Sequence, residues 1–270
     1  MTLAHRVPAA AESEFSVSWT RQEHGGSAGF GEAWFIHGML EDERTWLRLE
    51  SQVDAAVSLR PHFPWSSRNG QTWGREASGS EWIGRFVAAQ PARPDIVVCH
   101  SYGCNAVLDH LVWHQEHQPD VLVLVAPFYA ACRDEIRWSK LMDLADGLEQ
   151  LIAESIKVQD PAGRYRGELL KDITAKIRDR LGVYGWFEFL SLYLASPDLP
   201  LERLRCPTLI VSGRDDRYSP SDACDRLAAA LPHADHVVLD ANHFLQETHS
   251  SELAAAIRRF AATTERAIQS

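Results

Sequence analysis

Short apolar runs separated by longer helical patterns make up most of the chain. Two of these runs, 95–100 (DIVVCH) and 121–126 (VLVLVA), are apolar almost throughout. Continuous apolar runs of this length are typical of strands that are buried on both faces of a sheet. Similar short runs recur at 33–37, 55–60, 208–213 and 236–240.

Helical patterns lie between and after the apolar runs, for example at 104–117, 221–231 and 250–262. Strands that alternate with helices in this way predict an α/β fold with a mostly parallel sheet and right-handed crossovers. The first residues, 1–13, are mostly small or polar, and we expect them to form a loose tail.

One segment breaks this alternation. Between Phe128 and Pro200 no run has strand character, whereas apolar residues keep a helical spacing over 141–152 and 169–181. We therefore expect a helical insertion, residues 128–200, that covers the functional edge of the sheet as a lid. The alternative interpretation is that ordinary helices flanking the sheet form this segment.

The composition fits one globular domain that carries such an insertion. Of the 270 residues, 45% are apolar and 24% are charged. A chain of this size can bury roughly 70% of the surface that it exposes when unfolded. We expect the core domain to consist of two stretches, 14–127 and 201–266.

The charge and the cysteines restrict the partners and the compartment. A net charge of −10 repels phosphate backbones, so we expect no nucleic-acid partner. No run of about 18 apolar residues is present, so we expect no membrane span. The five scattered cysteines and the absence of a secretory signal at the N-terminus predict free thiols and a cytoplasmic protein.

The segment VVCHSYGCN (97–105) carries the strongest chemical signal. A strand ends near Cys99, Ser101 follows, and a helix begins, which predicts a sharp turn that projects the serine hydroxyl at the edge of the sheet. Only small residues avoid collisions on either side of such a turn, and Gly103 meets this requirement. The alternative interpretation is a serine that caps the helix.

Two later loops offer an acid and a base for this serine. Asp215 and Asp216 follow the predicted strand 208–213, and His243 follows the predicted strand 236–240. Acids and bases at the carboxyl ends of parallel strands gather at one edge of the sheet. Taken singly, the two aspartates could belong to a solvated turn or a helix cap, and the histidine to an ordinary loop.

The segment FIHGM (35–39) follows an early strand. Gly38 allows a tight turn, so that the backbone N–H groups of Met39 and Tyr102 can form an oxyanion hole beside Ser101. We expect His37 to orient this loop by hydrogen bonding and not to transfer protons.

The set FIHGM, CHSYG, SGRDD and ANHF resembles the α/β-hydrolase superfamily, in register from about residue 30 to about residue 263. The resemblance implies an eight-stranded core with a lid after the sixth strand. It also implies that the triad acid lies three residues after the glycine that ends its strand, which selects Asp216 over Asp215. The chain departs from the family pattern at Cys99 and at Cys104, which leaves the subfamily open.

The resemblance implies a serine hydrolase that cleaves an ester, a thioester or a related acyl bond. Ser101 is then the nucleophile, His243 the general base and Asp216 the acid that orients it. A serine at this position excludes members with an aspartate nucleophile. The first alternative is acyl transfer, cyclisation, carbon–carbon cleavage or lyase chemistry at the same site, and the second is a non-catalytic ligand receptor.

We expect the partner to be a small acyl substrate, either free or attached to a carrier protein. The residues expected to line its pocket are Trp65, Trp73, Phe128, Trp186 and Phe244. For the early tryptophans, core packing is an equal alternative. No cofactor and no metal is expected, and the histidines at 110, 114 and 117 are interpreted as one polar face of a helix. The sequence predicts no oligomeric state.

Overall fold

The computed structural model describes residues 3–6, 15–25, 29–160 and 162–269. Its centre is an eight-stranded sheet with the strand order β1-β2-β4-β3-β5-β6-β7-β8. The strands are β1 (Leu3–Arg6), β2 (Ser18–Glu23), β3 (Phe30–Ile36), β4 (Ala55–His62), β5 (Ile96–His100), β6 (Val121–Val125), β7 (Thr208–Gly213) and β8 (Ala234–Leu239).

The sheet is mostly parallel, which confirms the predicted α/β class. Pairing is parallel from β4 through β3, β5, β6 and β7 to β8, and antiparallel only for β1 with β2 and for β2 with β4. Every residue of β5, β6 and β7 is buried, because helices cover both faces of the sheet there.

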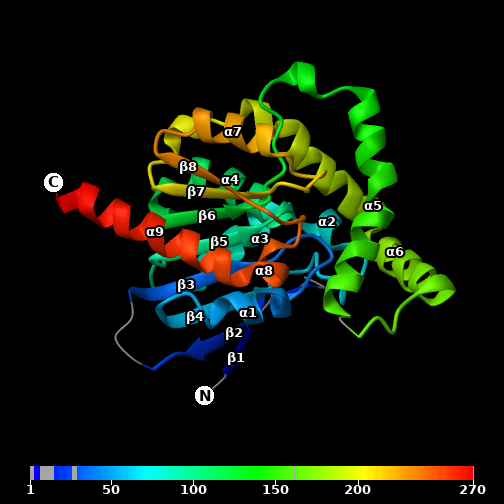
Figure 1. Ribbon diagram of the computed structural model, residues 1–270, viewed down its shortest axis with the longest axis horizontal. Coiled ribbons are helices and arrows are strands. Elements are labelled where there is room, and N and C mark those ends of the chain that lie inside the picture. Colours follow the sequence, from blue (N-terminus) through cyan, green and yellow to red (C-terminus); the bar gives the residue numbers. More distant parts are fainter. Residues whose placement is uncertain (1–2, 7–14, 26–28, 161, 270) are drawn as a thin grey trace.

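Two groups of helices cover the sheet, one on each face (Figure 1). One face carries α1 (Leu47–Glu50), α8 (Leu245–Thr248) and α9 (Ser250–Gln269). The other carries α2 (Trp73–Glu76), α3 (Gly79–Val87), α4 (Tyr102–Trp113) and α7 (Ser221–Ala230). The short 3-10 helices are η1 (Glu43–Trp46), η2 (Gln115–His117), η3 (Arg133–Glu135), η4 (Ser196–Asp198) and η5 (Leu201–Arg203).

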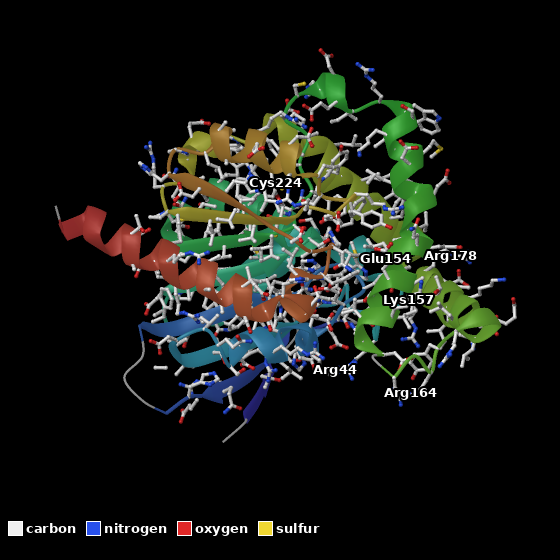
Figure 2. The ribbon with its side chains drawn as sticks, in the orientation of Figure 1. Arg44, Glu154, Lys157, Arg164, Arg178 and Cys224 are labelled. Atoms are coloured by element: carbon white, nitrogen blue, oxygen red, sulfur yellow. The ribbon has the colours of Figure 1, made fainter. Side chains whose placement is uncertain are left out.

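Two long helices, α5 (Trp138–Gln159) and α6 (Gly167–Ala195), lie between β6 and β7 in the chain and stand together at one end of the sheet (Figure 1). The described part of 128–200 contains helices and no strand, as the sequence predicts. Arg178 of α6 pairs with Glu149 of α5, and Figure 2 shows Arg178 where the two helices meet. The α6 helix bends at Gly182, whose φ is 61°.

The structure corrects the prediction for the N-terminus. Residues 3–6 were expected in a loose tail, but they form β1 and pair with β2. Residues 1–2 and 7–14 lie outside the described residues. The sequence pattern does not reveal β2 either, because it is a strand near the edge of the sheet whose residues SWTRQE are mostly polar.

Candidate active site

The turn at Ser101 joins β5 to α4 in a strained backbone conformation. Ser101 has φ 53° and ψ −125°, a combination that residues other than glycine rarely adopt. A Cβ at position 103 would lie 2.6 Å from the carbonyl oxygen of His37, so only glycine lets α4 start this close to the end of β3. The turn thus holds the Ser101 hydroxyl at the carboxyl edge of the sheet.

Ser101, His243 and Asp216 form one hydrogen-bonded chain. His243 Nε2 lies 3.0 Å from Ser101 Oγ, and His243 Nδ1 lies 2.8 Å from Asp216 Oδ2. These contacts fit the tautomer in which Nδ1–H donates to the carboxylate and Nε2 accepts from the serine. An imidazole held in this way can remove the serine proton. The three residues are 6%, 1% and 5% exposed in this order.

Asp216 is the acid that contacts His243, whereas Asp215 is exposed. The second carboxylate oxygen of Asp216, Oδ1, accepts hydrogen bonds from the backbone N–H groups of Tyr218 (2.8 Å) and Ser219 (3.0 Å). Burial opposes the charge, but His243 and these two donors outweigh burial and lower the pKa of Asp216. The carboxylate is therefore ionised at neutral pH and can stabilise a cation on His243.

The loop after β3 packs directly against Ser101. A Cβ at Gly38 would lie 3.1 Å from the Cβ of Ser101. The N–H of Gly38 donates to Glu41 Oε2 at 2.9 Å, and the N–H of Leu40 donates to the Trp65 carbonyl at 2.9 Å. The residues on both sides of Met39 are therefore held in place by hydrogen bonds. Together with the N–H of Tyr102 in the first turn of α4, the N–H of Met39 can donate to a negatively charged oxygen beside Ser101.

His37 supports this loop from within the core. Its Nδ1–H donates to the Gly38 carbonyl at 2.9 Å, and its Nε2 accepts the N–H of Phe63 at 3.3 Å. Because it is fully buried, the pKa of His37 is lowered and the ring stays neutral. These bonds fit an orienting role.

Ser101 and His243 open onto an apolar cavity between the core and the helices α5 and α6. Phe128, Trp186 and Phe244, three of the predicted pocket residues, line it. The sequence analysis missed one whole face of α5, which contributes Leu144, Leu148, Leu151, Ile152 and Ile156. Their helical spacing is visible in the sequence, but it does not show what they face.

Trp65 and Trp73 do not line this cavity, so of the two interpretations given for them the structure supports core packing and not pocket lining. Trp65 stacks on Phe63 with ring centroids 4.2 Å apart and meets Tyr102 edge-on at 5.3 Å. Trp73 meets the same tyrosine ring at 6.2 Å. The two indoles are 1% and 2% exposed, because packing under the Tyr102 turn buries them completely. Both indoles therefore pack against Tyr102, the residue that follows Ser101.

Comparison with known families agrees with this geometry. Residues 24–256 match the sequence model of the Alpha/beta hydrolase family. The chain belongs to that family. No curated protein matches its sequence.

Several solved structures share the α/β-hydrolase fold of this chain. A thioesterase domain from the curacin biosynthetic pathway has a TM-score of 0.64 at 18% identity, over 96% of this chain and 99% of that chain. A putative lipase from Acinetobacter baumannii has a TM-score of 0.71 at 17% identity, over 98% of this chain and 92% of that chain. A haloalkane dehalogenase from Bradyrhizobium elkani has a TM-score of 0.66 at 12% identity, over 99% of this chain and 100% of that chain. At these identities the likeness shows the fold alone.

This α/β-hydrolase family member holds a second Ser–His–Asp arrangement, which the sequence analysis did not detect. His236 Nε2 lies 2.8 Å from Ser212 Oγ, and His236 Nδ1 lies 2.6 Å from Asp225 Oδ1. Ser212 lies within β7 and is 0% exposed, so no substrate can reach its hydroxyl. This arrangement ties β7, β8 and α7 together, and it shows that access distinguishes the Ser101 site.

The histidines of α4 and η2 lie away from the site of this hydrolase fold. The rings of His110, His114 and His117 stack with centroids 4.6 to 5.4 Å apart. His114, His117 and Glu116 bring their ligand atoms within 4.8 Å of one another, with both His114 and Glu116 exposed. The group lies at the end of α4 opposite to Ser101. Within the described residues, no helix of the fold has the length and apolar character needed to cross a membrane.

Glu247 lies next to the polar end of the cavity, where Asp42, Arg44 and Gln159 line it; Figure 2 shows Arg44 below α5. Gln159 Nε2 and Thr45 Oγ1 donate to Glu247 Oε1 at 3.5 and 3.1 Å. Burial, with a smaller contribution from the charge of Glu41, raises the pKa of Glu247 from 4.5 to about 7.

Replacing Glu247 by glutamine is expected to stabilise the fold above neutral pH. Between pH 4.5 and about 7 the unfolded chain has lost the Glu247 proton while the folded chain keeps it, so the stability of the native protein falls as pH rises. Glu247→Gln removes this loss. Urea unfolding should show about 1–3 kcal/mol of added stability at pH 8 and none at pH 4. Glu252→Gln, at an exposed position on α9, is the control. An equal gain at both pH values would contradict the prediction.

Proposed function

We propose that the protein is a serine hydrolase that cleaves an ester, a thioester or a related acyl bond. The observation that carries this proposal is the continuous chain from Ser101 through His243 to Asp216 at an accessible apolar cavity. The buried Ser212 arrangement has the same contacts and no access, so the combination of geometry and access is what supports catalysis at Ser101.

The mechanism follows from the contacts of the three side chains. His243 Nε2 takes the Ser101 proton while Oγ attacks the acyl carbon, and the ionised Asp216 stabilises the imidazolium that forms. The backbone N–H groups of Met39 and Tyr102 receive the negative charge on the acyl oxygen. His243 then protonates the leaving group. In the second half of the reaction His243 removes a proton from water, which attacks the acyl carbon, and returns a proton to Ser101 Oγ as the acid leaves.

The helices α5 and α6, within residues 128–200, act in this proposal as a lid over an apolar acyl group. Side chains from both helices line the cavity into which Ser101 opens, including Leu148, Ile152 and Ile177. Apolar walls favour an acyl group without charge, because a buried charge without a partner is costly. The substrate can be a free ester or an acyl group carried by another protein.

A fluorophosphonate probe followed by intact-mass and peptide analysis tests the proposal. We expect one adduct per chain, located on Ser101, and none on the His243→Ala variant, because labelling requires an activated serine. The native protein should also hydrolyse nitrophenyl esters of apolar carboxylic acids, and the His243→Ala variant should not. Accessibility is checked with a small dye that binds in the cavity, in a series of detergent or solvent concentrations. If the dye binds to the folded native protein but no adduct forms under the same conditions, the assignment of Ser101 as nucleophile is contradicted.

A further inference from the structure

A buried pair, Glu41 and His100, lies directly behind His243. His100 is 0% exposed and Glu41 is 6% exposed. His100 Nδ1 lies 2.9 Å from Glu41 Oε1 and 3.0 Å from Glu41 Oε2. The rings of His100 and His243 have centroids 4.9 Å apart. The mechanism proposed above makes no use of either residue.

The hydrogen-bond partners indicate that His100 is an imidazolium. Its Nε2 lies 2.9 Å from the carbonyl oxygen of His243, which can only accept, and its Nδ1 faces the Glu41 carboxylate. With Glu41 ionised, both ring nitrogens of His100 donate. Glu41 also receives the N–H of Gly38 at 2.9 Å and the amide of Gln246 at 3.4 Å, the pattern expected of an ionised carboxylate.

The pair connects the two loops that flank Ser101. On one side Glu41 holds the N–H of Gly38, the residue before the proposed oxyanion donor Met39. On the other side His100 holds the backbone carbonyl of the proposed general base. We propose that the Glu41–His100 ion pair positions the oxyanion loop and His243 as one unit, and that the fixed cation on His100 controls how readily His243 accepts a proton. This inference rests on the proposed serine hydrolase mechanism.

The other charged groups near His100 are few. Among the described residues, Asp216 contributes from the loop after β7 and Glu247 from α8. The side-chain amide of Gln246 lies 3.3 Å from His100 Nδ1, and the rings of Trp46, Phe244 and His243 pack nearby. Burial opposes the charges of the pair, but their mutual attraction outweighs it, so the pKa of His100 is raised and that of Glu41 is lowered. A permanent cation beside the His243 ring opposes the formation of a second cation there.

The first part of the test is the pH profile of ester hydrolysis by four proteins: native, His100→Gln, Glu41→Gln and the double variant. With the cation removed and Glu41 left in place, the acidic limb of kcat/KM for His100→Gln should move up by about half to one pH unit. Each single variant should lose roughly tenfold to a hundredfold in kcat with little change in KM. The double variant should be no worse than the poorer single variant, because the pair acts as one unit.

His110→Gln is the matched control for this series. His110 is also buried, on the helix that follows Ser101, but its ring bonds to His117 at 2.9 Å at the far end of α4. It should keep the native pH profile. An unchanged pH profile in His100→Gln, or losses of kcat in the two single variants that multiply in the double variant, would overturn the inference.

A second measurement uses the native protein alone and does not depend on activity. Nitrogen-15 NMR of the histidine rings should show both nitrogens of His100 protonated throughout the pH range in which the enzyme is active. A His100 ring with one bare nitrogen in that range would overturn the inference even if the variants fail to fold. Failure of Ser101 to react with the fluorophosphonate would instead contradict the proposed function, and the His100 spectrum would still report on the ion pair.

Discussion

Replacing Ser101 by alanine is expected to lower kcat for ester hydrolysis by about 10⁶-fold and to abolish fluorophosphonate labelling. The hydroxyl is the nucleophile that attacks the acyl group, and its loss leaves only the oxyanion donors and the binding of the substrate. The measurement is steady-state hydrolysis of a nitrophenyl ester, together with intact mass after exposure to the probe. KM should change little, because the serine contributes to the transition state and not to the apolar contacts of the acyl group.

The second Ser–His–Asp arrangement supplies an internal control for this experiment. Ser212 contacts His236 at 2.8 Å, slightly closer than Ser101 contacts His243, but it is fully buried in β7. Ser212→Ala should therefore keep full labelling and full activity. Labelling that persists in Ser101→Ala and disappears in Ser212→Ala would contradict the proposed site.

Replacing Asp216 by asparagine is expected to lower kcat by about 10⁴-fold. The amide can donate to Nδ1, which favours the wrong tautomer of His243, and it carries no charge to stabilise the imidazolium. Asp216 also has a lowered pKa, so the native enzyme should keep its carboxylate ionised well into the acidic range.

Asp215→Asn is the matched control, since Asp215 is the exposed neighbour. Its kcat should stay within about twofold of native, as for a surface substitution that touches no partner in the site. Comparable losses in the two variants, measured as kcat at saturating ester, would contradict the assignment of Asp216. Circular dichroism should show both variants folded, because the amide oxygen in Asp216→Asn can still accept the N–H groups of Tyr218 and Ser219.

The strands that build the centre of the sheet are evident from the amino-acid pattern. The runs that form β5, β6 and β7 are continuously apolar because both faces of those strands are covered, and burial on two sides leaves a strong local signal. The polar strand β2 and the strand β1 left no such signal. Strands at the edge of a sheet and next to it are covered less than central strands, so their sequences are less constrained.

The residues of the proposed triad were also recognisable before the fold was known. A nucleophile turn requires small residues such as Gly103 close to the serine, and the acid and the base follow strands that end at the same edge. The choice of Asp216 over Asp215 came only from the family resemblance. In the structure it follows from which carboxylate lies 2.8 Å from His243.

Other features depended on contacts between segments far apart in the chain. Trp65 and Trp73 could face a pocket or a core with equal reason, and the packing of Tyr102 against them decides for the core. The partnership of Glu41 with His100 joins residues 59 positions apart, and neither belongs to a periodic pattern. Local spacing reports which side of a strand or helix is buried, because that depends on the element itself. Which side chains meet depends on how the elements pack, and that is decided only when the chain is folded.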